Sequence, residues 1–216
     1  MTMTYGSLSV RVASYLNRDD GLTLGRIPDF IADAQEMLAL ACKTIGQESS
    51  VVSAFIPGIS VYQKPANWKR NISINVGSPD NSGAFNIRNI LSLRTYEFLR
   101  EYTPNSADAT QWSLPLFYSD YGYSNFLVSP VPDLAYPFEF IYMGIPPPIT
   151  EQNQTNWWTN FAPHVLFNAV MTEAEFFLEN YDRAAAYEAK TQKGIDMINT
   201  QNDMRIVDRA SARQAD

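Results

Sequence analysis

Four short segments in the second half of the chain decide its fold. They read PLFYS (residues 115–119), FLVSPVPD (126–133), YPFEFIY (136–142) and TNWWT (155–159). The first three are rich in aromatic and branched apolar residues and are set apart by short turns, most of them with proline or glycine, a pattern typical of short β-strands. The fourth stands just ahead of a helical pattern. The order therefore predicts a β region that gives way to C-terminal helices.

The residues after these segments favour helices up to about residue 202. Pro163 occupies a first-turn position, and Asn180-Tyr181-Asp182 is a point where the helix kinks or restarts. One broad apolar face repeats at helical spacing; it consists of Val165, Leu166, Ala169, Val170, Phe176 and Phe177. The connector ahead of them, residues 145–149, contains three prolines, which favour an extended conformation.

The N-terminal part of the chain also predicts helices. Residues 7–17 place apolar side chains at helical spacing, and the Arg18–Gly21 segment ends that pattern. A second helix is predicted from Pro28 to about Lys43, because proline is favoured in a first turn. Asp29 stands where the helix dipole stabilises an acidic side chain.

Strand-like runs occupy the middle of the chain, between these helical ends. They lie at residues 51–56, 59–63, 72–76 and 85–91, and a short helix is predicted at 94–102. The run at 72–76 alternates strictly between apolar and polar residues, as does a strand with one buried face. The strands resume with the segments at 115–142.

This order of elements predicts an α+β fold: a helical bundle made from the N- and C-terminal helices, with a projecting β-rich insertion. We divide the chain into four parts. They are N-terminal helices of the bundle (1–48), a β-rich subdomain (49–145), C-terminal long helices of the bundle (146–202) and a flexible C-terminal tail (203–216).

Composition limits the classes of function. The formal net charge is −7, and Lys69-Arg70 is the only adjacent basic pair, whereas proteins that grip nucleic acid usually carry a basic stripe. No apolar run reaches the roughly 18 residues that a membrane helix needs. The single cysteine, Cys42, permits neither an internal disulfide nor a multi-cysteine metal site. We expect synthesis in a reducing cytoplasm and no tight binding of DNA.

Few residues offer catalytic chemistry. The only histidine, His164, follows Pro163 without a nucleophile motif, so we interpret it as a helix-surface or interface residue. Glu173, Glu175 and Glu179 are the candidates for an acid–base hydrolase, which stays open as an alternative. Glu175 and Glu179 stand four residues apart and are expected to share a solvent-exposed helix face. We expect a protein that is not an enzyme, without a metal or a cofactor.

Aromatic residues gather between residues 112 and 126. The set comprises Trp112, Phe117, Tyr118, Tyr121, Tyr123 and Phe126. Stacking on unpaired bases normally accompanies a positive groove, yet residues 111–142 contain no lysine or arginine. We therefore predict that these rings form the strand core and a protein interface. A carbohydrate- or receptor-binding β module is the alternative.

The C-terminal tail has too few apolar residues to fold alone. Its candidate contact residues are Met204, Arg205, Ile206, Val207, Arg209 and Arg213. The three arginines recur every four residues and would share one face if the tail became helical. A frayed, solvated end and a docking segment that orders on a partner both remain open.

Taken in order, these segments resemble the head-to-tail adaptor proteins of tailed bacteriophages, the head completion or connector proteins that include the tail tubular A-like gatekeeper. The resemblance rests on Leu24–Ile31 leading into the second helix, on the runs Leu116–Asp133 and Tyr136–Tyr142, and on Asn156-Trp157-Trp158 at the entry to a long helix. It covers most of the chain.

The resemblance implies a structural role in the virion neck. Such adaptors form a ring, usually of twelve subunits, below the portal protein. The ring extends the DNA channel, lets genomic DNA pass without specific binding, and docks the next tail component, a nozzle or a tail tube. It also implies that the C-terminal segment docks onto the portal. The family has no catalytic residues to transfer, and the acidic charge suits a channel to which DNA does not adhere.

Overall fold

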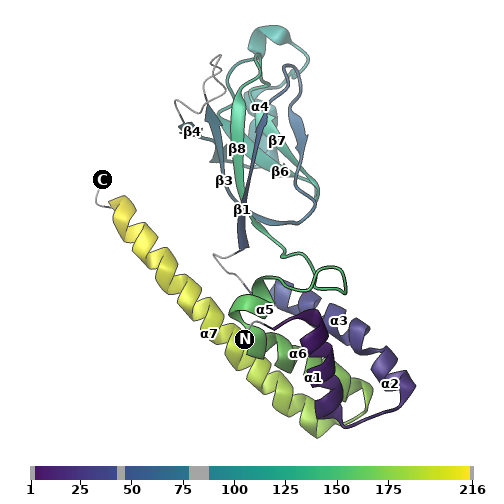
Figure 1. The fold of residues 1–216 in the computed structure, drawn as a ribbon. Helices are drawn as coiled ribbons and strands as arrows, with labels where there is room; N and C mark the ends of the chain where they lie inside the picture. The colour runs from purple at the N-terminus through teal and green to yellow at the C-terminus, as the bar shows by residue number, and fades with distance from the viewer. Residues whose placement is uncertain (1–2, 43–46, 78–87, 215–216) are drawn as a thin grey trace. The chain divides into compact units, whose positions relative to one another are not determined.

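The polypeptide leaves one structural unit for a second and then returns to the first (Figure 1). The structure is a computed structural model and describes residues 3–42, 47–77 and 88–214. A helical unit consists of Met1–Gln47 together with Ile145–Asp216, and a β unit consists of Glu48–Gly144. The sequence analysis places these changes after residues 48 and 145.

Helices from both ends of the chain make up the helical unit. The elements are α1 (Tyr5–Leu16), α2 (Gly21–Gly25), α3 (Ile27–Ala41), α5 (Trp157–Phe161), α6 (Pro163–Phe177) and α7 (Tyr181–Gln214). The prolines that predict helix starts, Pro28 and Pro163, do lie in the first turns of α3 and α6. The helix α2 was not predicted; Asp20 caps it by accepting a hydrogen bond from the Thr23 backbone N–H at 2.8 Å.

One apolar core joins the N-terminal and C-terminal helices. Leu8, Val12 and Leu16 recur every four residues on α1 and are buried, because this spacing places them on one helix face. They belong to the same cluster as residues of α3 and α6, which include Ile31, Ala34, Leu38, Leu166, Ala169 and Val170. Segments more than a hundred residues apart in sequence thus bury their apolar faces together.

A buried polar network lies beside this core. Gln35 of α3 accepts hydrogen bonds at Oε1 from the backbone N–H of Ile149 (2.8 Å) and from Nδ2 of Asn156 (3.1 Å). Asn156 also caps α5, since its Oδ1 accepts from the backbone N–H groups of Trp158 and Thr159. The network fixes the end of the proline-rich connector and the first turn of α5 against α3.

The β unit contains two four-stranded sheets (Figure 1). One has the order β1 (Glu48–Ala54), β8 (Pro137–Gly144), β3 (Trp68–Gly77), β4 (Arg88–Ile90), and all its pairs are antiparallel. The other has the order β2 (Val61–Gln63), β7 (Asn125–Ser129), β6 (Phe117–Tyr121), β5 (Ser92–Leu93), with β5 and β6 parallel. Two short helices complete the unit, α4 (Tyr96–Tyr102) and the 3₁₀ turn η2 (Ala109–Gln111).

Alternate residues of these strands form the second core. Phe138, Phe140 and Tyr142 of β8 are buried together with Phe126 and Val128 of β7, as the two-residue period of a strand requires. The rings of Phe126 and Phe140 lie 5.4 Å apart, which brings residues of the two sheets into contact. The α+β content predicted from the sequence is confirmed. Of the strand predicted at 85–91, residues 85–87 lie outside the described residues.

The last helix is longer than predicted. We expected a flexible tail from residue 203, but α7 continues without a break to Gln214 and spans 34 residues. Alanine, arginine and glutamine favour helix, and the segment extends a helix that is already packed on α6, so it needs no new nucleation. None of the described helices is both long enough and apolar enough to cross a membrane.

Close packing of α6 and α7 depends on a glycine. A Cβ atom added to Gly194 would lie 2.5 Å from Cγ2 of Val165, well inside van der Waals contact. Either Val165 or the α7 backbone would have to move to accept it. Gly194 therefore permits the close approach of the two helices at this point.

We predict that Gly194→Ala destabilises the helical unit by about 1–3 kcal/mol, because overpacking outweighs the gain in helix propensity. Circular dichroism at 222 nm should show a lower Tm. Gly25→Ala in α2 is the control, since no atom lies within 4 Å of its added Cβ. That variant should be neutral or slightly stabilised. Equal Tm values for the two variants would contradict the close packing.

Candidate functional site

Aromatic side chains of α4 and β6 form two groups of ring contacts on the β unit. Phe117 of β6 is met edge-on by two α4 rings, Phe98 at 5.2 Å and Tyr102 at 5.0 Å between centroids. Tyr96 of α4 stacks on Tyr121 of β6 at 5.7 Å. Edge-to-face and offset stacks of this kind stabilise a contact beyond the area that they bury.

Two arginines complete this set. The guanidinium carbon of Arg94 lies 5.6 Å from the ring centre of Phe98, and that of Arg100 lies 5.0 Å from the ring centre of Tyr96. Arg100 Nε also donates a hydrogen bond of 2.9 Å to Tyr96 Oη. We call the whole set the aromatic–arginine cluster; it comprises Arg94, Tyr96, Phe98, Arg100, Tyr102, Phe117 and Tyr121.

Local bonds hold the cluster in place. Thr95 caps α4 by accepting a hydrogen bond from the Phe98 backbone N–H at 3.3 Å, and the Arg94 backbone N–H donates to the Tyr118 carbonyl oxygen at 2.9 Å. The start of α4 is thereby fixed to β6. The rings nevertheless stay accessible, with 48% of Tyr102 and 39% of Tyr121 exposed.

Exposed tyrosine, phenylalanine and arginine side chains that are already packed on one another suit a protein-binding surface. These residue types are enriched in interfaces and in their energetic hot spots. Because their mutual contacts restrict the rings before binding, less conformational entropy is lost when a partner covers them. The arrangement therefore suits recognition of a protein partner.

The aromatic residues predicted as an interface divide into separate groups. Phe117 and Tyr121 belong to the cluster. Tyr118 and Phe126 are buried in the core of the β unit, the first of the two roles predicted for these rings. Burial, and next the nearby Asp120 carboxylate, raises the pKa of the Tyr118 hydroxyl.

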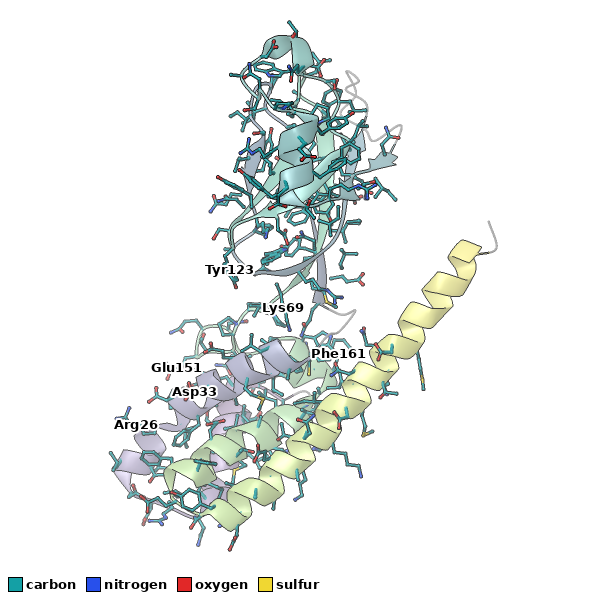
Figure 2. All side chains as sticks on the ribbon, turned by 180° about the vertical axis from the view of Figure 1, so that it is seen from behind. Arg26, Asp33, Lys69, Tyr123, Glu151 and Phe161 are labelled. Carbon is teal, nitrogen blue, oxygen red and sulfur yellow. The ribbon has the colours of Figure 1, made fainter. Side chains whose placement is uncertain are left out.

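The other two predicted aromatic residues lie elsewhere. Trp112 supports a loop: its Nε1 donates to the Ser106 carbonyl oxygen at 3.0 Å, and its ring covers Gly58, which has a positive φ of 81°. Tyr123 lies in the turn between β6 and β7 (Figure 2) and is 80% exposed. Its ring meets Trp68 edge-on at 5.9 Å.

The sequence analysis missed the cations of this region. Lys64 lies outside the aromatic window in sequence, yet its Nζ is 3.2 Å from an Asp120 oxygen and 3.6 Å from the Trp68 ring centre. Arg94 and Arg100 arrive with α4. The alternation of arginine and aromatic residues over 94–102 was a signal that could have identified them, because positions four apart on a helix are neighbours.

The predicted acidic face of α6 is wrong. Glu175 is completely buried, with Arg183 Nη2 at 2.8 Å from its Oε1 and Asn180 Nδ2 donating to its Oε2 at 2.9 Å. Glu179 follows the end of α6 with a positive φ of 58° and does not share that face. Burial, together with the Asp33 and Glu188 carboxylates, raises the pKa of Glu173.

Glu173 and Glu175 do not pair with each other as the two carboxylates of a hydrolase would. Glu173 and Glu175 are two residues apart on α6 and so do not face each other. Arg183 and Asn180 already occupy the oxygens of Glu175. His164 of α6 is exposed.

The predicted portal-docking residues lie on the last part of α7. Met204 is 64% exposed. The others belong to a continuous helix, and their side chains lie outside the described part of the structure; they are Arg205, Ile206, Val207, Arg209 and Arg213.

An exposed set of aromatic and arginine side chains is typical of surfaces that bind other proteins. The SU10 adaptor protein family matches residues 3–215. The match spans nearly the whole chain, so this protein belongs to the SU10 adaptor protein family. The resemblance to phage head-to-tail adaptors is confirmed, and such an adaptor is a virion component that associates with other head or tail parts. No curated protein matches the sequence significantly.

We predict that Phe98→Ala with Tyr102→Ala leaves the β unit folded, because partly exposed ring pairs contribute about 0.5–1.5 kcal/mol each. Phe126→Ala should cost about 3–5 kcal/mol, since it opens a cavity in the core. Hydrogen exchange of the β7 amides separates the two outcomes. Strong loss of protection in the double variant would assign the cluster to the core instead of the surface.

Proposed function

We propose that this protein is a structural head-to-tail adaptor that forms a ring below the portal of a tailed phage, extends the DNA channel and docks the tail. The observation that carries the proposal is the family match over residues 3–215. The role is not enzymatic, and the place of action is the virion neck. We take the ring to be a dodecamer, as the family resemblance implies.

In this proposal the two units have different roles. The helical unit forms the body of the ring, and the β-rich unit projects toward the tail. The aromatic–arginine cluster is the surface that docks the next tail component, a nozzle or a tail tube. Its support is physical: the exposed rings of Tyr102 and Tyr121 provide area, and Arg100, which lies over Tyr96 in the same cluster, provides directional charge to a partner.

The end of α7 contacts the portal in this proposal. Arg205, Arg209 and Arg213 recur every four residues along a helical segment, the spacing at which residues share a helix face. Arginine binds carboxylates with two parallel hydrogen bonds, so it suits an interface that has to form in one orientation.

The main test is a deletion of residues 203–216. Because the segment extends beyond the apolar core residues of α7, of which Ile195 is buried, the deletion should change Tm by little. Attachment to portal-bearing heads, scored by head completion and by cryo-electron microscopy of the neck, should be lost. Deletion of 215–216 alone is the control for an altered C-terminus. Normal head completion by the longer deletion would refute portal docking through α7.

The location in the virion decides between this function and the alternative. Density for the protein in a rotationally symmetric ring at the neck supports the adaptor. Density outside the neck, together with glycan-array binding that Phe98→Ala with Tyr102→Ala abolishes, would favour the carbohydrate-binding module instead.

We predict weak binding of duplex DNA. With a net charge of −7, the protein should bind DNA with a Kd of roughly 10⁻⁴ M or weaker at physiological salt, the range of non-specific binding. Fluorescence anisotropy with a labelled duplex measures this. Tighter binding with a steep salt dependence would mean that the protein clamps DNA, and would contradict a channel through which DNA moves freely.

A further inference from the structure

A groove crosses the helical unit where α7 passes the start of α6. It has a volume of about 390 Å³. Phe161 stands at its rim beside α7 (Figure 2), and Met197 of α7 lies along it. Both side chains are largely exposed, by 73% and 59%. The groove therefore presents apolar surface that no described residue covers.

The charges around this groove have one sign. The charged residues that line it are Lys190 and Lys193 of α7, and no acidic residue is among its described lining residues. The two lysines are exposed and three residues apart, so they project from neighbouring turns of one helix face. An apolar groove with a cationic edge suits a ligand that is aromatic or aliphatic and carries carboxylates.

A surface of this character exists on the same chain. At the junction of α6 and α7, Phe176 is 56% exposed and Tyr181 is 59% exposed, and their rings meet edge-on at 5.5 Å. Glu179 and Asp182 beside them are exposed carboxylates. We call these four residues the aromatic–acidic corner.

The corner keeps its acidic character and a defined shape. The neighbouring cation, Arg183, is already held by Glu175. The backbone is fixed as well, since the Leu178 N–H donates to Ala174 O at 3.2 Å and the Asn180 N–H to Glu175 O at 2.9 Å. The corner is therefore a preformed projection, which reduces the entropy lost on binding.

The groove and the corner cannot meet within one molecule. They lie at opposite ends of α6, which has 15 residues and is therefore about 22 Å long. A contact between them needs two copies of the chain. Such a contact joins two different faces, so it repeats from copy to copy and produces a closed ring when the rotation closes.

We infer that the groove of one copy binds the aromatic–acidic corner of the next copy. The aromatic side chains of the corner fill the groove, and Glu179 and Asp182 pair with Lys190 and Lys193. The inference rests on the proposed ring, for which it supplies the lateral interface. A second copy is the occupant that the structure favours, because exposed aromatic side chains and the complementary charge lie on the same unit.

A cross-linking experiment tests this contact. Met197→Cys on one full-length chain and Tyr181→Cys on another should give a disulfide-linked dimer on mild oxidation, both in concentrated purified protein and in assembled heads. Native Cys42 is buried. The matched control replaces Tyr181→Cys by Leu22→Cys, a residue that is 69% exposed on α2. That mixture should give only background cross-linking.

Charge reversal distinguishes a specific contact from misfolding. Lys190→Glu with Lys193→Glu on the Met197→Cys chain should lower the yield about tenfold, because like charges then oppose each other. Glu179→Lys with Asp182→Lys on the Tyr181→Cys chain should restore it. Restoration supports the inference, since damaged folding would not be repaired by a partner. Background yield in both purified protein and heads, or no restoration, overturns it.

Failure of the proposed adaptor function can be distinguished from failure of this interface. A ring at the neck without this cross-link would leave the adaptor function intact and refute the interface. A cross-link in purified protein without any neck density would support the interface and refute the adaptor function.

Discussion

The buried hydrogen bonds that Gln35 accepts from Ile149 and Asn156 are the constraint on which the two-unit fold depends. The chain leaves the helical unit at residue 47 and returns at 145. Contacts with residues distant in sequence therefore have to position the returning segment. Asn156 does this by contacting Gln35 and by capping α5. Each group is buried, and leaving one unpaired would cost about 1–3 kcal/mol. The network therefore admits one register of the connector against α3.

Local periodicity predicted where the helices begin, but it did not predict which of their acidic side chains are buried. Pro28 and Pro163 mark first turns because proline needs no backbone donor there, and this information is present in a few residues. The burial of Glu175 depends on Arg183, which lies beyond the break between α6 and α7. A helix pattern continued through that break assigns Glu175 and Glu179 to one face, whereas the positive φ of Glu179 ends it.

In the candidate site, too, some features could be predicted from local sequence and others depend on residues from another element. Strand alternation explains why Tyr118 is buried while its neighbour Phe117 reaches the aromatic–arginine cluster. The cations could not be predicted from residues 111–142 alone, because α4 brings them: Arg94 lies over Phe117 of β6, and Arg100 lies over Tyr96 of α4. Side chains contributed by a separate element change a set of apolar rings into a surface with directional charge. The aromatic residues in the sequence therefore indicated where the candidate site lies, but they did not indicate its arginines.

Separate cores give this chain separate contact surfaces. The β unit buries its own rings around Phe126 and Phe140, and the helical unit buries Leu8 with Leu166. Each unit is thus stabilised without the other, and each keeps exposed aromatic side chains at its own surface. In the proposed ring, the helical unit makes the contacts between copies and the β unit makes the contacts with the tail, so the two kinds of contact are supported by different cores. Under that proposal, a subunit can be held in the ring before its tail partner arrives.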